Sequence, residues 1–318
     1  MKINNLLITA IGGDIAQSVT KIIKQNRPDI KIIGVDMNTR HAGMVFVDEF
    51  IQIPAANHLE YLPTLKELIK KFKVDILLPM SEIEISICAD MDNQLENSLI
   101  LYCGKKGLDI GLDKLKTNQF LQSINAPYPW TEVVADAKYI KLPCILKPKT
   151  GSGSKGVYRV ENQLDFDYFK QKYPNYIFQE LLTPSTQEIT CAIYRTKTGE
   201  THVLQMLRQL IGDATGWAVV INRPHINQLC IKIANELNIK GSINVQLINN
   251  EDGAYIFEIN PRISSTVAMR NAIGFQDVIW MLDEIEEKQI SVPVIKNKKI
   301  MLKTCDVVVL DNLESEIL

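Results

Sequence analysis

A chain of 318 residues has room for two or three domains, and its 46% hydrophobic and 23% charged residues are ordinary values for a soluble globular enzyme. The formal net charge is −2 and there is no long basic block, so we expect no nucleic-acid partner. No basic segment with a cleavage site opens the chain, and no apolar run approaches ~20 residues. We therefore expect a cytoplasmic protein with no membrane partner.

The first 110 residues alternate segments typical of strands with segments typical of helices. Helical spacing of apolar residues occurs at 15–23 and 61–72, and a further helix is expected to begin at Ser81. This alternation predicts a parallel sheet with helices on both faces. The expected strands are 3–10, 30–35, 49–53, 74–79 and 100–102.

Ligands of open parallel sheets bind outside the carboxyl ends of the strands. The residues at those ends are candidate substrate contacts, although turn and helix-cap chemistry is the preferred explanation for each of them. They are Gly12, Gly13, Asp14, Asp36 and Glu82. The glycine turn followed by Asp36 imitates a dinucleotide fingerprint, so an NAD(P)-dependent dehydrogenase is an alternative, but the later glycines of that fingerprint are missing.

From residue 112 a helix is expected to run until shortly before Pro127, and the segments after it resemble strands. Runs at 143–147 and 156–160 predict an antiparallel pair, and with the runs at 176–182, 187–190 and 203–207 they predict a small mixed sheet. A helix at 224–237 precedes a hairpin of 242–248 and 254–260. The cysteines are scattered without C-x-x-C pairs and are expected to be reduced core residues: Cys88, Cys103, Cys144, Cys191, Cys230 and Cys305.

The loop between the antiparallel pair is rich in glycine, serine and lysine. It follows Lys147 and includes Lys149 before its first glycine and Lys155 between two of its glycines. Glycines let backbone N–H groups approach phosphate oxygens, and lysines supply the countercharge. The loop therefore predicts phosphate binding, with an ordinary hairpin turn as the alternative.

Polar side chains gather at the end of the predicted hairpin. Glu258 and Asn260 point to the same face of an extended strand, and Gln246 can lie beside them. These oxygen donors suit Mg²⁺, which takes one or two carboxylate ligands and completes its shell from water and phosphate. Arg262 adds a permanent cation beside them. The alternative is a polar strand end capped by Asn-Pro.

The segment Glu258-Ile-Asn-Pro-Arg-Ile-Ser-Ser265 resembles ATP-grasp proteins. Asn244-Val-Gln246 lies before this segment and Asn271-Ala-Ile-Gly-Phe275 lies after it. Together these motifs make the sequence similar to the large chain of carbamoyl-phosphate synthetase and its short stand-alone relatives. The similarity extends from about residue 110 to about residue 290. The resemblance implies an α/β domain at 1–110, namely a parallel-sheet, Rossmann-like pre-ATP-grasp domain. A two-lobed α+β ATP-grasp domain follows, with a small lobe at 111–182 and a large lobe at 183–318.

The resemblance also implies roles for individual residues. Lys147 and Arg262 would be catalytic, with Lys147 and Lys114 holding ATP phosphates. The glycine loop would contribute Gly151, Ser152, Gly153, Ser154 and Gly156. The adenine and ribose would meet Gln179, Glu180, Leu181, Leu182 and Glu188. The ligands of Mg²⁺, or of Mn²⁺ in its place, would be Gln246, Glu258 and Asn260.

The activity that the resemblance implies is ATP-dependent ligation of a small-molecule carboxylate to an amine or a thiol, through an acyl phosphate, with release of ADP and phosphate. A non-catalytic nucleotide-binding or regulatory protein is the alternative. Carbamoyl phosphate synthesis itself is not expected, because 318 residues leave no room for a second synthetase half. A homodimer is the default expectation for such an enzyme.

Overall fold

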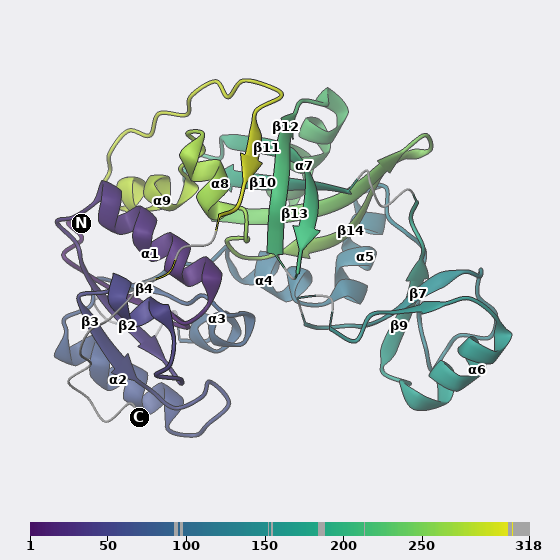
Figure 1. Ribbon diagram of the computed structural model, residues 1–318, viewed down its shortest axis with the longest axis horizontal. Helices are drawn as coiled ribbons and strands as arrows, with labels where there is room; N and C mark the ends of the chain where they lie inside the picture. The colour runs from purple at the N-terminus through teal and green to yellow at the C-terminus, as the bar shows by residue number, and fades with distance from the viewer. Residues whose placement is uncertain are drawn as a thin grey trace.

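The computed structural model describes residues 1–91, 95, 98–151, 153, 155–183, 188–212, 214–304 and 307. Across these residues the strands form three sheets, which Figure 1 shows at the lower left, at the top centre and at the right. Ser152, Ser154 and Cys305 lie outside the described residues, and the other five cysteines are buried free thiols, as predicted. In the part of the chain that the structure describes, no helix is long and apolar enough to cross a bilayer.

The N-terminal part is the predicted parallel sheet. Its strand order is β3-β2-β1-β4-β5, and every pairing is parallel. The strands are β1 (Asn5–Ile8), β2 (Lys31–Asp36), β3 (Glu49–Gln52), β4 (Ile76–Leu78) and β5 (Leu99–Ile100). The connections include α1 (Asp14–Asn26), the 3₁₀ helix η1 (Ala42–Phe46), α2 (Tyr61–Lys71) and α3 (Glu82–Ala89).

Alternate side chains of β1 pack into two different cores, one on each face of the sheet, which is why every residue of its apolar segment is buried. Leu6 and Ile8 pack with α1, whereas Leu7 packs with Leu65 of α2 on the other face. Strands of a parallel sheet that is covered on both faces are typically continuous runs of apolar residues. The fold class of this part was therefore readable from the sequence.

The small lobe contains a four-stranded antiparallel sheet of order β6-β9-β7-β8. Cys144 and Leu146 of β7 are buried in its core, so that Ile145 and Lys147 face the other way. The elements of this lobe are β6 (Thr131–Val133), β7 (Cys144–Pro148), β8 (Tyr158–Val160), α6 (Gln163–Lys172) and β9 (Tyr176–Glu180). Helices α4 (Lys105–Gly111) and α5 (Lys114–Ser123) precede it in the chain and pack into the core of the large lobe through Leu108, Phe120 and Leu121.

The large lobe is built on a six-stranded antiparallel sheet of order β14-β13-β10-β11-β12-β15. Helix α7 packs on one face of it, and α8 and α9 pack on the other. The elements are β10 (Glu188–Arg195), β11 (Thr201–Ile211), β12 (Ala214–Ile221), α7 (Pro224–Glu236), β13 (Gly241–Asn250), β14 (Gly253–Asn260), α8 (Val267–Ala272), α9 (Asp277–Ile285) and β15 (Ile300–Leu302).

The predicted small mixed sheet was wrong. The segment 176–180 joins the antiparallel hairpin of β7 and β8, but 188–195 and 201–211 belong to the separate six-stranded sheet. Neither sheet is mixed, because both contain only antiparallel pairings in the described residues. The sequence patterns also did not predict α4, β6, α6, β12, α8, α9 and β15. We propose to keep the domain boundaries near residues 110 and 182, since each falls between two sheets.

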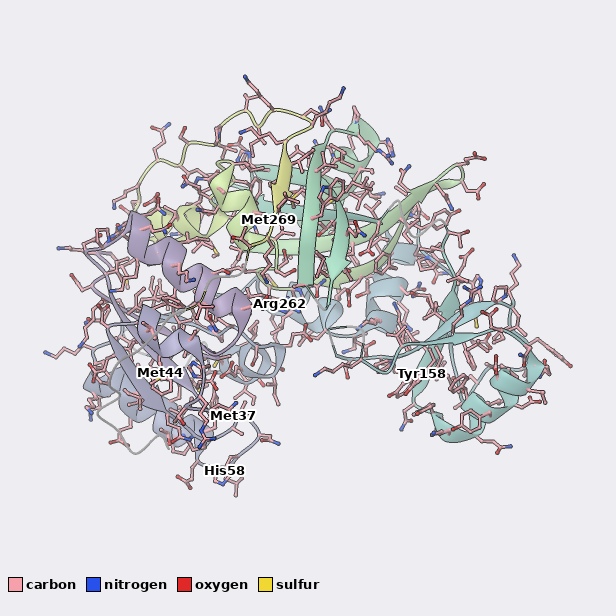
Figure 2. All side chains as sticks on the ribbon, viewed as in Figure 1. Met37, Met44, His58, Tyr158, Arg262 and Met269 are labelled. Carbon is pink, nitrogen blue, oxygen red and sulfur yellow. The ribbon has the colours of Figure 1, made fainter. Side chains whose placement is uncertain are left out.

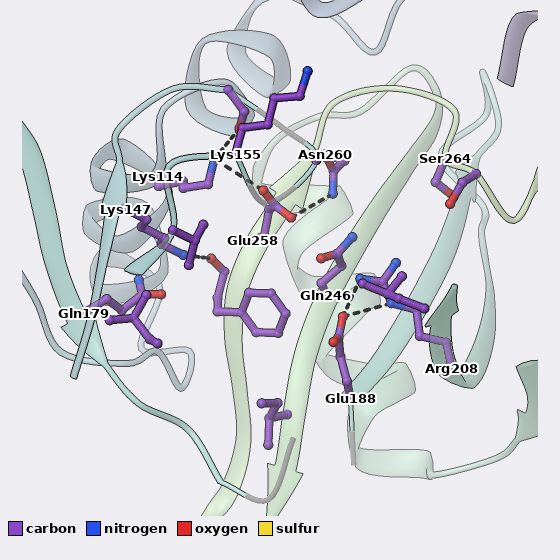
Figure 3. A pocket seen from close by; sticks show the side chains of 18 of the residues that line it. Lys114, Lys147, Lys155, Gln179, Glu188, Arg208, Gln246, Glu258, Asn260 and Ser264 are labelled. Atoms are coloured by element: carbon purple, nitrogen blue, oxygen red, sulfur yellow. Dashed lines mark hydrogen bonds and ion pairs between the residues drawn. The ribbon is translucent and has the colours of Figure 1, made fainter. Parts of the chain in front are cut away.

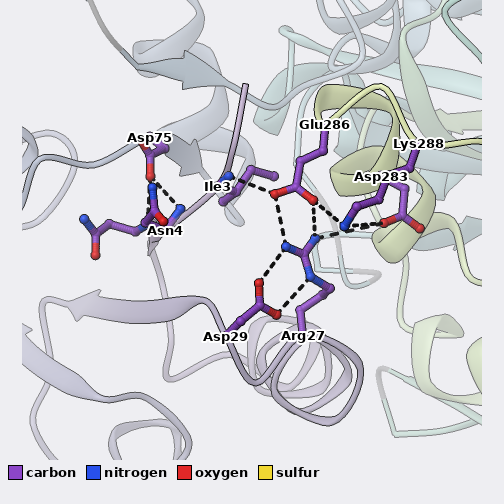
Figure 4. A network of polar contacts seen from close by, with 9 residues as sticks. Ile3, Asn4, Arg27, Asp29, Asp75, Asp283, Glu286 and Lys288 are labelled. Atoms are coloured by element: carbon purple, nitrogen blue, oxygen red, sulfur yellow. Dashed lines mark hydrogen bonds and ion pairs between the residues drawn. The ribbon is translucent and has the colours of Figure 1, made fainter.

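Helices α8 and α9 join the N-terminal part to the large lobe. Val267 and Leu282 share a buried core with Val19 of α1. A polar network lies at one end of this contact, where Arg27 and the Ile3 N–H both bind the carboxylate of Glu286 just after α9 (Figure 4). The two parts are therefore held by apolar packing and by an ion pair.

Candidate active site

A cavity of about 600 Å³ lies between the small-lobe sheet and the six-stranded sheet (Figure 3). It brings together most of the residues that the sequence patterns had indicated. Those that line it are Lys114, Lys147, Gly151, Gly153, Gln179, Glu180, Leu181, Leu182, Glu188, Gln246, Glu258, Asn260 and Arg262. Gly156 is not among the lining residues, although its φ of +72° is one that glycine adopts without strain.

Lys147 reaches the cavity from β7 and is only 6% exposed. Its ammonium lies 3.4 Å from the carbonyl oxygen of Phe257, and Glu258 is close to it. Burial lowers the pKa of Lys147 from its ordinary 10.5 to about 8, although the charge of Glu258 acts in the opposite direction. The side chain is therefore a poorly solvated cation, which an anionic ligand would stabilise.

Lys114 is the first residue of α5, where Asp113 caps the helix by accepting the N–H groups of Leu115 and Lys116. The Lys114 ammonium donates to the carbonyl oxygen of Gly151 at 2.6 Å and lies 3.4 Å from Oε1 of Glu258. One lysine thus ties the start of the glycine loop to the predicted metal ligand.

The predicted metal ligands lie together at the end of the β13–β14 hairpin. Gln246 is paired with Glu258 across the two strands, and the Asn260 amide lies 3.5 Å from Oε2 of Glu258. A bulge after this pair leaves Phe257 without a partner, so Phe257 and Glu258 both line the cavity although they are neighbours in sequence.

This donor set fits magnesium. It offers one carboxylate and two amides, which leaves most of the coordination shell for water and phosphate oxygens, as Mg²⁺ prefers. Among the described residues there is no cluster of three or more His, Cys, Asp or Glu side chains that could hold a metal without such help. The site residues therefore suit a metal that arrives with a nucleotide.

Glu188 and Gln179 are both held by neighbours. Oε1 of Glu188 accepts two N–H groups of Arg208, with Nε at 2.9 Å, which leaves Oε2 available to a ligand hydroxyl. The Gln179 amide donates to Thr131 at 2.9 Å. Neither partner was predicted from the sequence, because Arg208 and Thr131 come from other strands.

Arg262 lies where the N-terminal part meets the large lobe (Figure 2). Its Nη2 and Nε donate to Oε1 of Glu82, at 2.8 and 3.2 Å. Glu82 is placed by the start of α3, where Ser81 and Glu84 form a reciprocal capping box. Through Glu82, the N-terminal part therefore orients Arg262, which lines the cavity.

The remaining charged and glycine residues near the site differ in their surroundings. Arg270 is 1% exposed and pairs with Asp277 at 2.7 Å, so it is a structural residue. Asp14 lines the same cavity as Arg262, whereas the remaining N-terminal candidates, Gly12, Gly13 and Asp36, line a second cavity. Lining residues that received no individual role from the sequence include Lys155, Ser264, Ser265, Ile145, Ile248 and Phe257. The parity of strand residues could have pointed to Ile145, two residues before Lys147.

Comparison with known proteins agrees with this geometry. A family model described as the ATP-grasp domain matches residues 112–266, and the two lobes with the cavity between them lie largely within that range. This part of the chain matches the ATP-grasp family. Residues 6–101 match a model described as the PylC-like, N-terminal domain. The finer likeness to the carbamoyl-phosphate synthetase large chain stays a prediction.

Solved structures show the same fold at low sequence identity. N5-carboxyaminoimidazole ribonucleotide synthetase from Thermus thermophilus is 13% identical, with a TM-score of 0.75 over 93% of this chain and 82% of that chain. L-amino acid ligase from Bacillus licheniformis is 16% identical, with a TM-score of 0.72 over 88% and 74%. The biotin carboxylase domain dimer of Hydrogenobacter thermophilus 2-oxoglutarate carboxylase, in complex with MgADP, is 16% identical, with a TM-score of 0.75 over 94% and 74%.

Proposed function

We propose that this protein is an ATP-dependent ligase that joins a small-molecule carboxylate to an amine through an acyl phosphate. One observation carries the proposal. Two lysines, from α5 and β7, and a carboxylate with two amides, from β13 and β14, surround one cavity beside a glycine loop. This chemistry neutralises a polyphosphate on one side and holds its metal on the other. The match to this family favours this proposal over a nicotinamide-dependent reaction.

The nucleotide would lie between the two sheets. Lys114 and Lys147 would hold its phosphates, and the adenine and ribose would meet the segment from Gln179 to Leu182 and Glu188. Apolar side chains of the cavity, such as Ile145 and Ile248, would contact the base. Gln246, Glu258 and Asn260 would hold Mg²⁺, which when bound offsets the charge of the phosphates.

The reaction would have two steps. A substrate carboxylate oxygen attacks the γ-phosphorus, the bond to the β–γ bridging oxygen breaks, and ADP leaves. An amine nitrogen then attacks the acyl carbon, phosphate departs and the nitrogen loses a proton. The protein contributes position and positive charge, the latter from Lys147 and Arg262. Closure of the glycine loop would keep water from the acyl phosphate. A thiol in place of the amine follows the same sequence.

The test is release of ADP and phosphate from Mg-ATP by the purified protein, across a matrix of carboxylic acids and amines. We expect one pair to stimulate release and to yield a ligated product by mass spectrometry. Glu258→Gln should lower that rate at least about 100-fold. Glu251→Gln is the matched control, because it removes an exposed carboxylate from the turn of the same hairpin.

Tight nucleotide binding without product for any pair would favour the non-catalytic alternative. Retention of most of the stimulated rate in Glu258→Gln would contradict the metal assignment. Light scattering of the same preparation tests the expected homodimer.

A further inference from the structure

A second cavity, of about 880 Å³, opens at the carboxyl ends of the N-terminal parallel strands. The loops that follow β1, β2, β3 and β4 all contribute to its lining. Cavities in this place of a parallel sheet are where such folds bind small ligands. The proposed ligase chemistry uses none of the side chains that line it.

Asp36, the last residue of β2, supplies a carboxylate to this cavity. Its two oxygens accept the N–H groups of Gly12 and Asn38, at 2.9 and 2.8 Å. A Cβ on Gly12 would lie only 2.9 Å from the His41 ring and 3.0 Å from the Asp36 carboxylate, so glycine permits this close approach. Backbone donors thus fix the carboxylate in place.

Asp36 has capacity left for a ligand. A carboxylate can accept about four hydrogen bonds, of which two are made here. It forms no ion pair with any residue that the structure describes, and it is 8% exposed. A nearly buried carboxylate without a cation is a strong acceptor for hydroxyl groups.

The rim of the cavity carries the opposite charge. Arg40 is exposed and forms no ion pair within the described residues. Neutral polar side chains line the same cavity, namely Asn38, Thr39 and Gln52. Glu84 also lines it, but its carboxylate is already engaged with Thr9, Tyr61 and Ser81.

We propose that this cavity binds a polyhydroxylated anion of the sugar-acid or sugar-phosphate class, with ligand hydroxyls donating to Asp36 and the anionic group facing Arg40. An amino-acid zwitterion would match the two charges. However, it would leave the neutral polar side chains of the cavity without hydrogen-bond partners.

Two short segments separate this cavity from the nucleotide cavity. Gly13 lines one and its neighbour Asp14 lines the other. Ser81 and Ile83 line the second cavity, whereas Glu82 between them binds Arg262 of the first. That the bound anion is also a ligation substrate rests on the proposed function, but its binding does not.

The test is calorimetric titration of the nucleotide-free protein with ribose 5-phosphate, glucuronate, neutral ribose, inorganic phosphate and lysine. We expect ribose 5-phosphate or glucuronate to bind more tightly than ribose, phosphate or lysine. Asp36→Asn and Arg40→Ala should each weaken that binding about 10-fold or more. The matched controls Asp136→Asn and Arg159→Ala, on exposed residues of the small lobe, should leave it unchanged.

Arg40→Ala keeps the test valid if Asp36→Asn disturbs the Gly12 loop, because no described residue depends on the Arg40 side chain for an ion pair. Absence of binding by both hydroxylated anions at millimolar concentration would overturn the proposal. Tighter binding of lysine, or binding that neither variant weakens, would also overturn it. Titration with an ATP analogue in the same protein reports the nucleotide cavity separately, so failure of one site is distinguishable from failure of the other.

Discussion

Lys114 and Glu258 form an ion pair in the wall of the cavity, with 3.4 Å between Nζ and Oε1. Lys114 begins helix α5, which packs into the core of the large lobe, and Glu258 lies on β14. The lysine thus occupies the carboxylate that is proposed to hold the metal. A metal ion alone must compete with this cation, whereas nucleotide phosphates would draw the lysine away from it.

We therefore expect Lys114→Met to act in opposite directions on metal and nucleotide. Mn²⁺ affinity without nucleotide should rise roughly 3- to 10-fold, because a partly buried competing cation is removed. ADP affinity should fall about 10-fold, because a charged hydrogen bond to phosphate is lost. Electron paramagnetic resonance of Mn²⁺ and calorimetry measure the two quantities. Lys116→Met, on the exposed side of α5, is the control, and a parallel loss of both affinities would disprove the competition.

Lys147 predicts a pH dependence of nucleotide binding. Its pKa of about 8 means that the ligand-free protein carries the ammonium below pH 8 and loses it above. Bound phosphates favour the charged form, so binding above pH 8 should take up a proton from the buffer, and nucleotide affinity should fall as pH rises. Calorimetry in buffers of different ionisation enthalpy measures the uptake. The Lys147→Arg variant stays charged and should take up no proton on binding. Equal proton uptake in both proteins would exclude Lys147 as the group that is protonated.

Glu82 is expected to position Arg262. In Glu82→Gln the guanidinium loses its charged partner, so kcat should fall about 10-fold while nucleotide affinity changes little, since the nucleotide contacts lie elsewhere. Steady-state kinetics with the substrate pair found above separates kcat from KM. Glu67→Gln on the exposed side of α2 is the matched control. An unchanged kcat in Glu82→Gln would show that Arg262 needs no such partner.

Glu286 predicts a pH dependence of stability. Burial alone would raise the pKa of Glu286, but the hydrogen bonds that it accepts from Lys288, the Ile3 N–H and Arg27 lower it from 4.5 to about 2. A carboxylate with a lowered pKa stabilises the fold above pH 4.5 and loses this effect as the pH falls toward about 2.

Glu286→Gln should therefore lower the free energy of unfolding by about 1–3 kcal/mol at neutral pH, and the difference from the unmodified protein should shrink below pH 4.5. Denaturant titrations at several pH values measure this difference. Glu287→Gln, the exposed neighbour, should unfold like the unmodified protein. A pH-independent difference would mean that the network acts through packing rather than charge.

Local pattern was sufficient for much of the fold and for the centre of the site. The apolar run of β2 and the helical spacing of α2 identified the N-terminal sheet, because both patterns repeat over a few residues. The same holds for Glu258 and Asn260, since residues two apart on a strand share a face. Elements with weaker local patterns were missed, such as the three-residue β6 and the highly charged α6.

The sequence by itself determined the residue types of a phosphate and metal site and their order along the chain. Only the tertiary structure decided which of them meet. The bulge that turns both Phe257 and Glu258 into the cavity depends on strand pairing, and the bond between Glu82 and Arg262 joins residues 180 positions apart. Periodicity reports which face of its own element a side chain occupies, whereas such pairs exist because α8 and α9 pack against α1 and bring the parts of the chain together.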